Sequence, residues 1–220
     1  MSVRPRPRAV LFDLDGTLLD TAPDFVLALN AVRAEESLAP LTLAQVRPHV
    51  SHGSPALIRA SFGDRDGESV FAHRRQRLLD CYAAVLAQAA QLFPGVAQVL
   101  DAIEQRGLVW GIVTNKPSWL TTPLLAAFDL DTRAGCVIAG DSTPRSKPHP
   151  QPLLAGAQAL GMATIECLYV GDAERDVAAA RAAGMPALIA LYGYLSVDDQ
   201  PLSWGGAGTL ATPLDLLAWI

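Results

Sequence analysis

Residues 9–21 read AVLFDLDGTLLDT, and this stretch decides the fold. The four apolar residues Ala9 to Phe12 predict a buried strand, because a strand covered on both faces reads as a continuous apolar run. Two carboxylates, Asp13 and Asp15, come directly after it. Positions i and i+2 of an extended chain point to the same side, so both acids are expected to address one site at the end of the strand. Gly16 then allows the backbone to turn.

Short apolar runs of the same kind recur along the chain, with helical stretches between them. Helices are expected at residues 95–106 and 173–183, because each stretch ends at a glycine, Gly107 or Gly184. The alternation predicts the α/β class, with a Rossmann-like parallel sheet whose ligands collect at the carboxyl ends of the strands. The further strands are expected at residues 108–113, 136–139, 167–170, 185–191 and 207–211.

Residues 21–93 do not follow this alternation of strands and helices. From Thr21 to Phe93 the sequence shows helical pattern and no convincing strand. A crossover between parallel strands takes a helix and two short loops, far less than these roughly 70 residues. We therefore predict a core domain made of residues 1–20 and 94–220, and a helical cap domain of residues 21–93 inserted after the first strand.

Composition narrows the functional classes. The chain has 220 residues, half of them hydrophobic, and a formal net charge of −5. This excludes disorder and disfavours a general nucleic-acid binder. No apolar run approaches the roughly 18 residues of a membrane span. The arginine- and proline-rich start, Met1 to Arg8, has no apolar core of a signal peptide, and the three cysteines are far apart, so a cytoplasmic protein is expected.

Polar residues follow the next strand and a later loop. Thr114 and Asn115 come directly after residues 108–113, where a hydroxyl and an amide can donate hydrogen bonds to an oxyanion. Both residue types also begin turns and cap helices. Lys147 stands in the proline-flanked segment 146–150, and a lysine considered singly is more simply interpreted as a solvated surface residue.

A second pair of acids follows the strand at 167–170. Asp172 stands at its end, and Asp176 lies in the first turn of the next helix, where the helix dipole alone favours an acid. Together with Asp13 and Asp15, these acids would converge at one edge of the sheet and repel one another without a cation. Hard oxygen ligands suit Mg²⁺, so the set predicts a magnesium site that accepts a substrate phosphate.

These motifs resemble, in order and spacing, those of the haloacid dehalogenase-like (HAD) hydrolases, specifically their phosphatase branch. The match covers the whole predicted core, and the strings DxDGTLxDT at residues 13–21 and GDxxxD at residues 171–176 are highly specific. The resemblance implies the HAD fold, with a helical cap after the first strand. It also implies a phosphoric monoester hydrolase rather than a dehalogenase, because dehalogenases of the superfamily lack the second acid.

By this resemblance, Asp13 is the nucleophile that becomes an aspartyl-phosphate, and Asp15 is the general acid and then the general base. Thr114 and Asn115 would bind the phosphoryl oxygens. Lys147 would neutralise charge at the nucleophile and the phosphate. These roles agree with the chemistry, since attack by a carboxylate divides one difficult displacement into two easier ones.

The resemblance also implies the ligands of the cofactor. Mg²⁺ would be held by Asp13, by the backbone carbonyl of Asp15 and by Asp172, with Asp176 supporting from nearby. The implied substrate is a small phosphorylated metabolite, with no nucleic acid or membrane as partner.

The cap is expected to select the substrate, because the core contacts mainly phosphate. His49 and His52 lie in a polar break between helices, and Arg59 follows on the next helix. This segment resembles the substrate-specificity loop of the family, and each residue is equally well interpreted as an ordinary surface side chain.

Several functions remain open at this point. The general pattern resembles phosphoglycolate phosphatases. Residues 21–25, 110–117, 192–194 and 204–205 resemble the N-acetylmuramic acid 6-phosphate phosphatases of cell-wall recycling. A β-phosphoglucomutase-like phosphomutase of carbohydrate metabolism would share every core residue. A receiver-type signalling module also combines acids, Thr, Lys and Mg²⁺, but it has no helical insertion of this size.

Overall fold

The computed structural model describes residues 6–64 and 67–220, so residues 1–5 of the arginine- and proline-rich start lie outside the described residues. The chain divides into two compact units, one of Met1–Leu19 with Leu92–Ile220 and one of Asp20–Gln91. These boundaries lie within two residues of those expected from the sequence. We call the first unit the core unit and the second the inserted unit.

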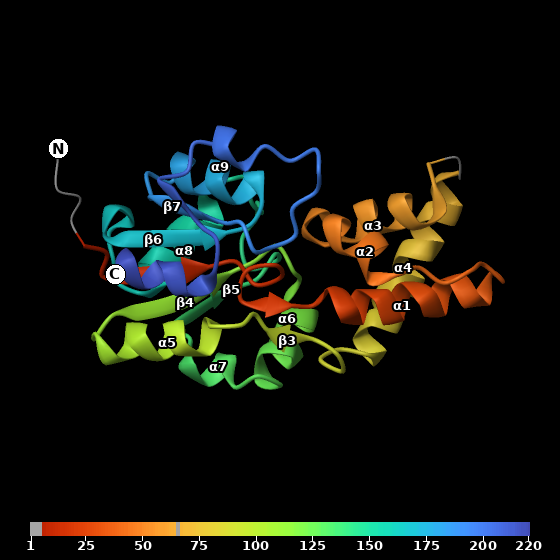
Figure 1. Ribbon diagram of the computed structural model, residues 1–220, viewed down its shortest axis with the longest axis horizontal. Helices are drawn as coiled ribbons and strands as arrows, with labels where there is room; N and C mark the ends of the chain where they lie inside the picture. Colours follow the sequence, from red (N-terminus) through yellow and green to blue (C-terminus); the bar gives the residue numbers. More distant parts are fainter. Residues whose placement is uncertain (1–5, 65–66) are drawn as a thin grey trace. The chain divides into compact units, whose positions relative to one another are not determined.

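The core unit contains a six-stranded, entirely parallel sheet of strand order β5-β4-β1-β6-β7-β8 (Figure 1). The predicted α/β class is confirmed, and each strand begins and ends within two residues of its predicted range. The central strand β1 is buried along its whole length, as a continuous apolar run predicts. The strands are β1 (Ala9–Phe12), β4 (Val109–Val113), β5 (Cys136–Ile138), β6 (Cys167–Gly171), β7 (Ala187–Ala190) and β8 (Gly208–Leu210).

Helices cover both faces of this sheet (Figure 1). Helices α8 and α9 pack on one face, where Leu11 and Tyr169 share a buried cluster with Leu153 and Val177. Helix α5 covers the other face, where the Trp110 indole N–H donates a hydrogen bond of 3.0 Å to Glu104. The α-helices are α5 (Val96–Gln105), α6 (Ser118–Ala126), α7 (Leu130–Arg133), α8 (Gln151–Ala159) and α9 (Glu174–Ala182); the 3-10 helices are η2 (Thr164–Glu166), η3 (Pro201–Ser203) and η4 (Pro213–Ala218).

The inserted unit is helical, with Phe25 of α1 stacked on Tyr82 of α4 at a ring separation of 4.0 Å. Asp24 is fully buried and accepts backbone hydrogen bonds from residues 87, 89 and 90, which fixes the segment after α4. The helices are α1 (Ala22–Glu35), α2 (Leu43–Val46), η1 (Arg47–His52), α3 (Gly53–Phe62) and α4 (Glu68–Ala84).

The expectation that residues 21–93 hold no strand is wrong at one point. Two short strands, β2 (Leu19–Asp20) and β3 (Gln91–Leu92), pair as a separate two-stranded sheet where the chain leaves the core unit and returns to it. Two residues are too few to give the alternating pattern from which a strand is predicted. Among the described helices, none has both the length and the apolar character needed to span a membrane.

Candidate active site

Three strands of the core unit end side by side, and their polar continuations form the candidate site. Phe12 at the end of β1 is in register with Ile112 on β4 and with Val170 on β6. The residues that follow these strands therefore meet at one edge of the sheet. Asp13, Asp172 and Asp176 each offer a carboxylate oxygen there, all within 4.8 Å of one another, and all three residues are buried.

Asp13 presents its two oxygens differently. Its Oδ1 accepts a hydrogen bond of 2.8 Å from the Leu14 backbone N–H and lies 3.0 Å from the Lys147 ammonium. Among the described residues, none donates to Oδ2. One oxygen is thus held in place while the other is available to a ligand or to an electrophile.

Asp172 and Asp176 are positioned by backbone groups. The Tyr194 N–H donates to Asp172 Oδ2 at 2.9 Å, and the Ala173 N–H donates to Asp176 Oδ2 at 3.0 Å. The remaining oxygen of Asp176, Oδ1, lies 2.8 Å from the Lys147 ammonium. Both oxygens of Asp176 are therefore engaged with the protein.

Lys147 is the cation of this cluster. The structure does not agree with a solvated surface lysine, because the residue is only 2% exposed. Its Nζ donates to the Val113 carbonyl at 2.9 Å and to the Tyr169 hydroxyl at 2.8 Å, in addition to the ion pairs with Asp13 and Asp176. A buried ammonium needs such partners, since an unpaired charge is costly to remove from water.

Asn115 holds the backbone of Lys147. Its side-chain Nδ2 donates to the Lys147 carbonyl at 2.9 Å, and its Oδ1 accepts from the Lys147 N–H at 3.0 Å. Both polar atoms of the amide are therefore used to fix the lysine. Thr114 is buried beside it, and its hydroxyl oxygen accepts a hydrogen bond from the Lys116 N–H at 3.2 Å.

Tyr169 was missed by sequence reasoning. It lies fully buried in the middle of β6, and its hydroxyl donates to the Val113 carbonyl at 2.9 Å beside Lys147. Burial, together with Asp176 and Asp13, raises the pKa of this phenol well above its ordinary value, so it stays neutral. The available signal was a tyrosine inside an apolar strand, whose buried hydroxyl requires a polar partner.

The carboxylates do not titrate alike. Burial, and then the charge of Asp176, raise the pKa of Asp13 to about 6, although Lys147 and Arg175 oppose this change. Burial alone would also raise the pKa of Asp176, but Lys147 and Arg175 outweigh it and hold that pKa below its ordinary value. The two pKa values are therefore shifted in opposite directions.

Asp15 lies outside the carboxylate cluster and forms a second ion pair. Lys116 Nζ lies 3.2 and 3.3 Å from the two carboxylate oxygens of Asp15, so it contacts both symmetrically. Lys116 is 7% exposed. Sequence reasoning did not select it, because the lysine follows the Thr–Asn pair in a turn where many residue types are ordinary.

Gly16 is required by the close packing around Asp172. Its φ of +85° favours glycine, and a Cβ there would lie 2.2 Å from Asp172 Oδ2. Across the same carboxylate lies the loop at residues 192–194, where the Tyr192 hydroxyl donates to the Thr17 carbonyl at 3.1 Å. This loop, which the sequence marked only by a family resemblance, therefore contributes to the site.

The three predicted specificity residues lie in the inserted unit. His49 and His52 belong to the 3-10 helix η1, where His49 is half-buried and His52 exposed. Arg59 on α3 forms an ion pair of 3.5 Å with Asp64, and its guanidinium lies 5.2 Å from the ring centroid of Phe71. These contacts account for the position of Arg59 within its own unit.

The donor set fits a divalent cation. Buried carboxylate oxygens within 4.8 Å of one another are hard ligands, which Mg²⁺ prefers to nitrogen or sulfur. Asp13 is the best candidate for a direct ligand, because no described residue donates to its Oδ2, and Asp172 and Asp176 complete the set of neighbouring carboxylates.

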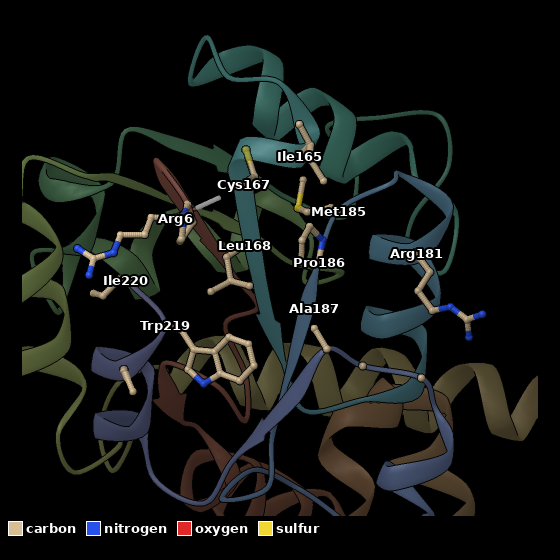
Figure 2. Close-up of a pocket in the computed structure, with 15 residues that line it drawn as sticks. Arg6, Ile165, Cys167, Leu168, Arg181, Met185, Pro186, Ala187, Trp219 and Ile220 are labelled. Atoms are coloured by element: carbon tan, nitrogen blue, oxygen red, sulfur yellow. The ribbon is translucent and has the colours of Figure 1, made fainter. Parts of the chain in front are cut away.

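A separate pocket lies at the opposite edge of the sheet, where β6 and β7 begin (Figure 2). It has a volume of about 600 Å³ and a largely apolar lining that includes Leu168, Met185 and Trp219. Arg6 and Arg181 stand on opposite sides of it, and Figure 2 shows their guanidinium groups pointing away from each other. The two cations do not converge on one anion, so this pocket does not compete with the carboxylate cluster as the active site.

Comparison with known proteins identifies the family of this chain. The sequence model described as "Haloacid dehalogenase-like hydrolase" matches residues 10–190. A phosphoglycolate phosphatase of Xanthomonas campestris pv. campestris is 50% identical over 90% of this chain and 89% of its own length. An N-acetylmuramic acid 6-phosphate phosphatase of Pseudomonas aeruginosa is 38% identical over 97% of this chain and 95% of its own. The crystal structure of a predicted phosphoglycolate phosphatase from Haemophilus somnus 129pt superposes with a TM-score of 0.86 at 26% identity, covering 98% of this chain and 99% of that one.

Proposed function

This chain belongs to the haloacid dehalogenase-like hydrolase family and is a phosphoric monoester hydrolase, and from that premise we propose that it is a Mg²⁺-dependent phosphatase with an aspartyl-phosphate intermediate. The observation that carries the proposal is the buried cluster of Asp13, Lys147 and Asp176 at the end of β1. In this cluster, Asp13 Oδ2 accepts no hydrogen bond from a described residue, and the Lys147 ammonium is fixed beside it.

In the proposed first step, Asp13 Oδ2 attacks the phosphorus atom and the bond from phosphorus to the ester oxygen breaks. Lys147 stabilises the negative charge that develops on the phosphoryl oxygens. The Thr114 hydroxyl is the proposed donor to a phosphoryl oxygen. The Asn115 side chain acts on Lys147, because its amide is already bonded to that residue's backbone.

The proton transfers are assigned to Asp15. It gives a proton to the departing alkoxide, then takes one from the water whose oxygen attacks the aspartyl-phosphate and releases phosphate. Lys116 contacts both Asp15 oxygens and is proposed to orient that carboxylate.

A bound Mg²⁺ would supply positive charge that offsets repulsion between the nucleophile and the phosphate. Asp13, Asp172 and the Asp15 backbone carbonyl are the proposed ligands, with Asp176 in support. We also propose that the protein is cytoplasmic. Its three cysteines, all among the described residues, are free thiols, which agrees with a reducing compartment.

We propose 2-phosphoglycolate as the substrate, since the relatives of that name reach 50% identity over 90% of the chain. N-acetylmuramic acid 6-phosphate is the second candidate, favoured by a relative that aligns over 97% of the chain. His49, His52 and Arg59 of the inserted unit are proposed to discriminate between such substrates.

Phosphate release from the two compounds and from p-nitrophenyl phosphate, measured as kcat/KM with Mg²⁺, tests these assignments. We expect turnover of all three, fastest with 2-phosphoglycolate. No release from any of them would contradict the phosphatase mechanism, and phosphate returned to the product would indicate a phosphomutase.

His52→Ala and Arg59→Ala test the proposed role in specificity. Each is expected to change which of the two metabolites has the higher kcat/KM, and to leave kcat/KM for p-nitrophenyl phosphate unchanged. Equal losses on all three would contradict a role in specificity.

A further inference from the structure

Lys147 has more hydrogen-bond partners than protons. An ammonium has three N–H donors, and its Nζ lies within hydrogen-bond distance of four oxygens. Two donors serve the carboxylates of Asp13 and Asp176. The third is shared between the Val113 carbonyl at 2.9 Å and the Tyr169 hydroxyl at 2.8 Å.

The Tyr169 hydroxyl adds a fourth proton to this network. It donates to the Val113 carbonyl at 2.9 Å, closer than its 3.4 Å approach to Asp176. The two side-chain donors to that carbonyl are thus Lys147 and Tyr169. If the Lys147 N–H turns away, the Val113 carbonyl keeps the hydrogen bond from the Tyr169 hydroxyl.

We propose that Tyr169 is a positioning residue that frees one N–H of Lys147 for the phosphoryl group of the substrate. This inference rests on the proposed function, in which Lys147 stabilises the transferring phosphoryl group. When the third N–H turns from Val113 to a phosphoryl oxygen, Tyr169 keeps the carbonyl satisfied. Without the hydroxyl, the same movement leaves a buried carbonyl without a donor, which is unfavourable.

Tyr169→Phe isolates this role, because it removes the hydroxyl and keeps the ring. The Lys147 ammonium lies 5.4 Å from the ring centroid, so the contact with the aromatic ring remains. The ring's packing in the buried cluster under α8 and α9 remains as well. Tyr82→Phe is the matched control, since Tyr82 is also fully buried but lies in the inserted unit.

Kinetics and phosphate binding are the first measurements. For Tyr169→Phe we expect kcat/KM to fall about tenfold, and the affinity for inorganic phosphate, measured by calorimetry, to fall by a similar factor. Tyr82→Phe is expected to change neither by more than twofold. Wild-type values for both quantities in Tyr169→Phe would overturn the inference. A wild-type protein that releases no phosphate would instead contradict the proposed function.

A double-mutant cycle tests whether the effect passes through Lys147. In a Lys147→Met background, Tyr169→Phe is expected to cause no further loss of phosphate affinity. An additional loss of the same size there would show that the hydroxyl acts by another route.

Nuclear magnetic resonance gives a direct readout, because Lys116 and Lys147 are the two lysines of the chain. With ¹³C-labelled lysine, two Cε signals are expected, and Lys116→Met assigns them. Tyr169→Phe should shift the Lys147 signal and leave that of Lys116 in place. An unmoved Lys147 signal would contradict the proposed contact.

Discussion

The two lysines of this protein lie in one site but in different surroundings. The Lys147 side chain is completely buried among four oxygens, and its carboxylate partners Asp13 and Asp176 are at most 4% exposed. Lys116 contacts Asp15, whose side chain is 18% exposed. All other basic side chains of the chain, apart from histidine, are arginines. The comparison separates a fixed, buried cation beside the proposed nucleophile, Asp13, from an ion pair in which the acid, Asp15, remains partly accessible.

The largest effect is expected from replacing Asp13, the proposed nucleophile and an ion-pair partner of Lys147. Asp13→Asn keeps the shape of the residue but removes the carboxylate proposed as the nucleophile, so we expect kcat to fall by about 10⁴-fold or more. Phosphate release with p-nitrophenyl phosphate measures this, and the exposed Asp131→Asn serves as control. Wild-type turnover in a folded Asp13→Asn protein would exclude Asp13 as the nucleophile.

Replacing Asp15, the acid paired with Lys116, should lower kcat/KM by a factor that depends on the leaving group. Asp15→Asn removes the proposed proton donor, and we expect kcat/KM to fall by about 10²- to 10⁴-fold for alkyl phosphates. The loss should be smaller with p-nitrophenyl phosphate, since its leaving group needs little protonation. The ratio of the two losses is the measurement, and a ratio of one would contradict a role as general acid.

Removing the fixed cation should affect all substrates equally. Lys147→Met removes the ammonium that pairs with Asp13 and Asp176, and we expect kcat to fall by about 10²- to 10³-fold whichever ester is used. The same panel of esters measures this. A loss confined to poor leaving groups would assign Lys147 to the Asp15 side of the site instead.

The pKa of Asp13 predicts how the metal-free protein responds to pH. Its folded value of about 6 lies above the ordinary 3.8, so the folded state binds the proton more tightly. This contribution to stability is complete below about pH 4 and is lost as pH rises through 6, by up to about 3 kcal/mol. Asp176, whose pKa is lowered, changes protonation only below this window.

Chemical denaturation of the metal-free protein between pH 4 and 7 measures this dependence. With Asp13 as the proposed ligand, Mg²⁺ binding displaces its proton, so the affinity for Mg²⁺ should rise about tenfold per pH unit up to about pH 6 and then level off. Asp13→Asn should abolish both dependences. If both persist in that variant, another group is responsible.

The smallest effect is expected at Lys116. Lys116→Met removes a contact that orients Asp15 without removing the acid, so we expect kcat/KM to fall by about tenfold, equivalent to about 1.4 kcal/mol. The loss should be concentrated in esters with poor leaving groups. A loss as large and uniform as that of Lys147→Met would remove the distinction between the two lysines.

Some of this site was predictable from sequence and some was not. Continuous apolar runs located β1 to the residue, and they placed Asp13 and Asp172 at strand ends that the parallel sheet brings together. Lys147 was selected by family resemblance, because a loop lysine carries no local signal of burial. Tyr169 and Lys116 were missed because their importance depends on contacts across 56 and 101 residues of sequence, which no local pattern records.

The pairing of β2 with β3 has a consequence for how such a protein can change. Because Leu19–Asp20 and Gln91–Leu92 belong to neighbouring strands, the two ends of the inserted unit lie about 5 Å apart. A segment whose ends are so close can be exchanged for one of different length with little cost in loop-closure entropy. An inserted unit of different length or sequence is therefore compatible with an unchanged β1 and with unchanged Asp13 and Asp15.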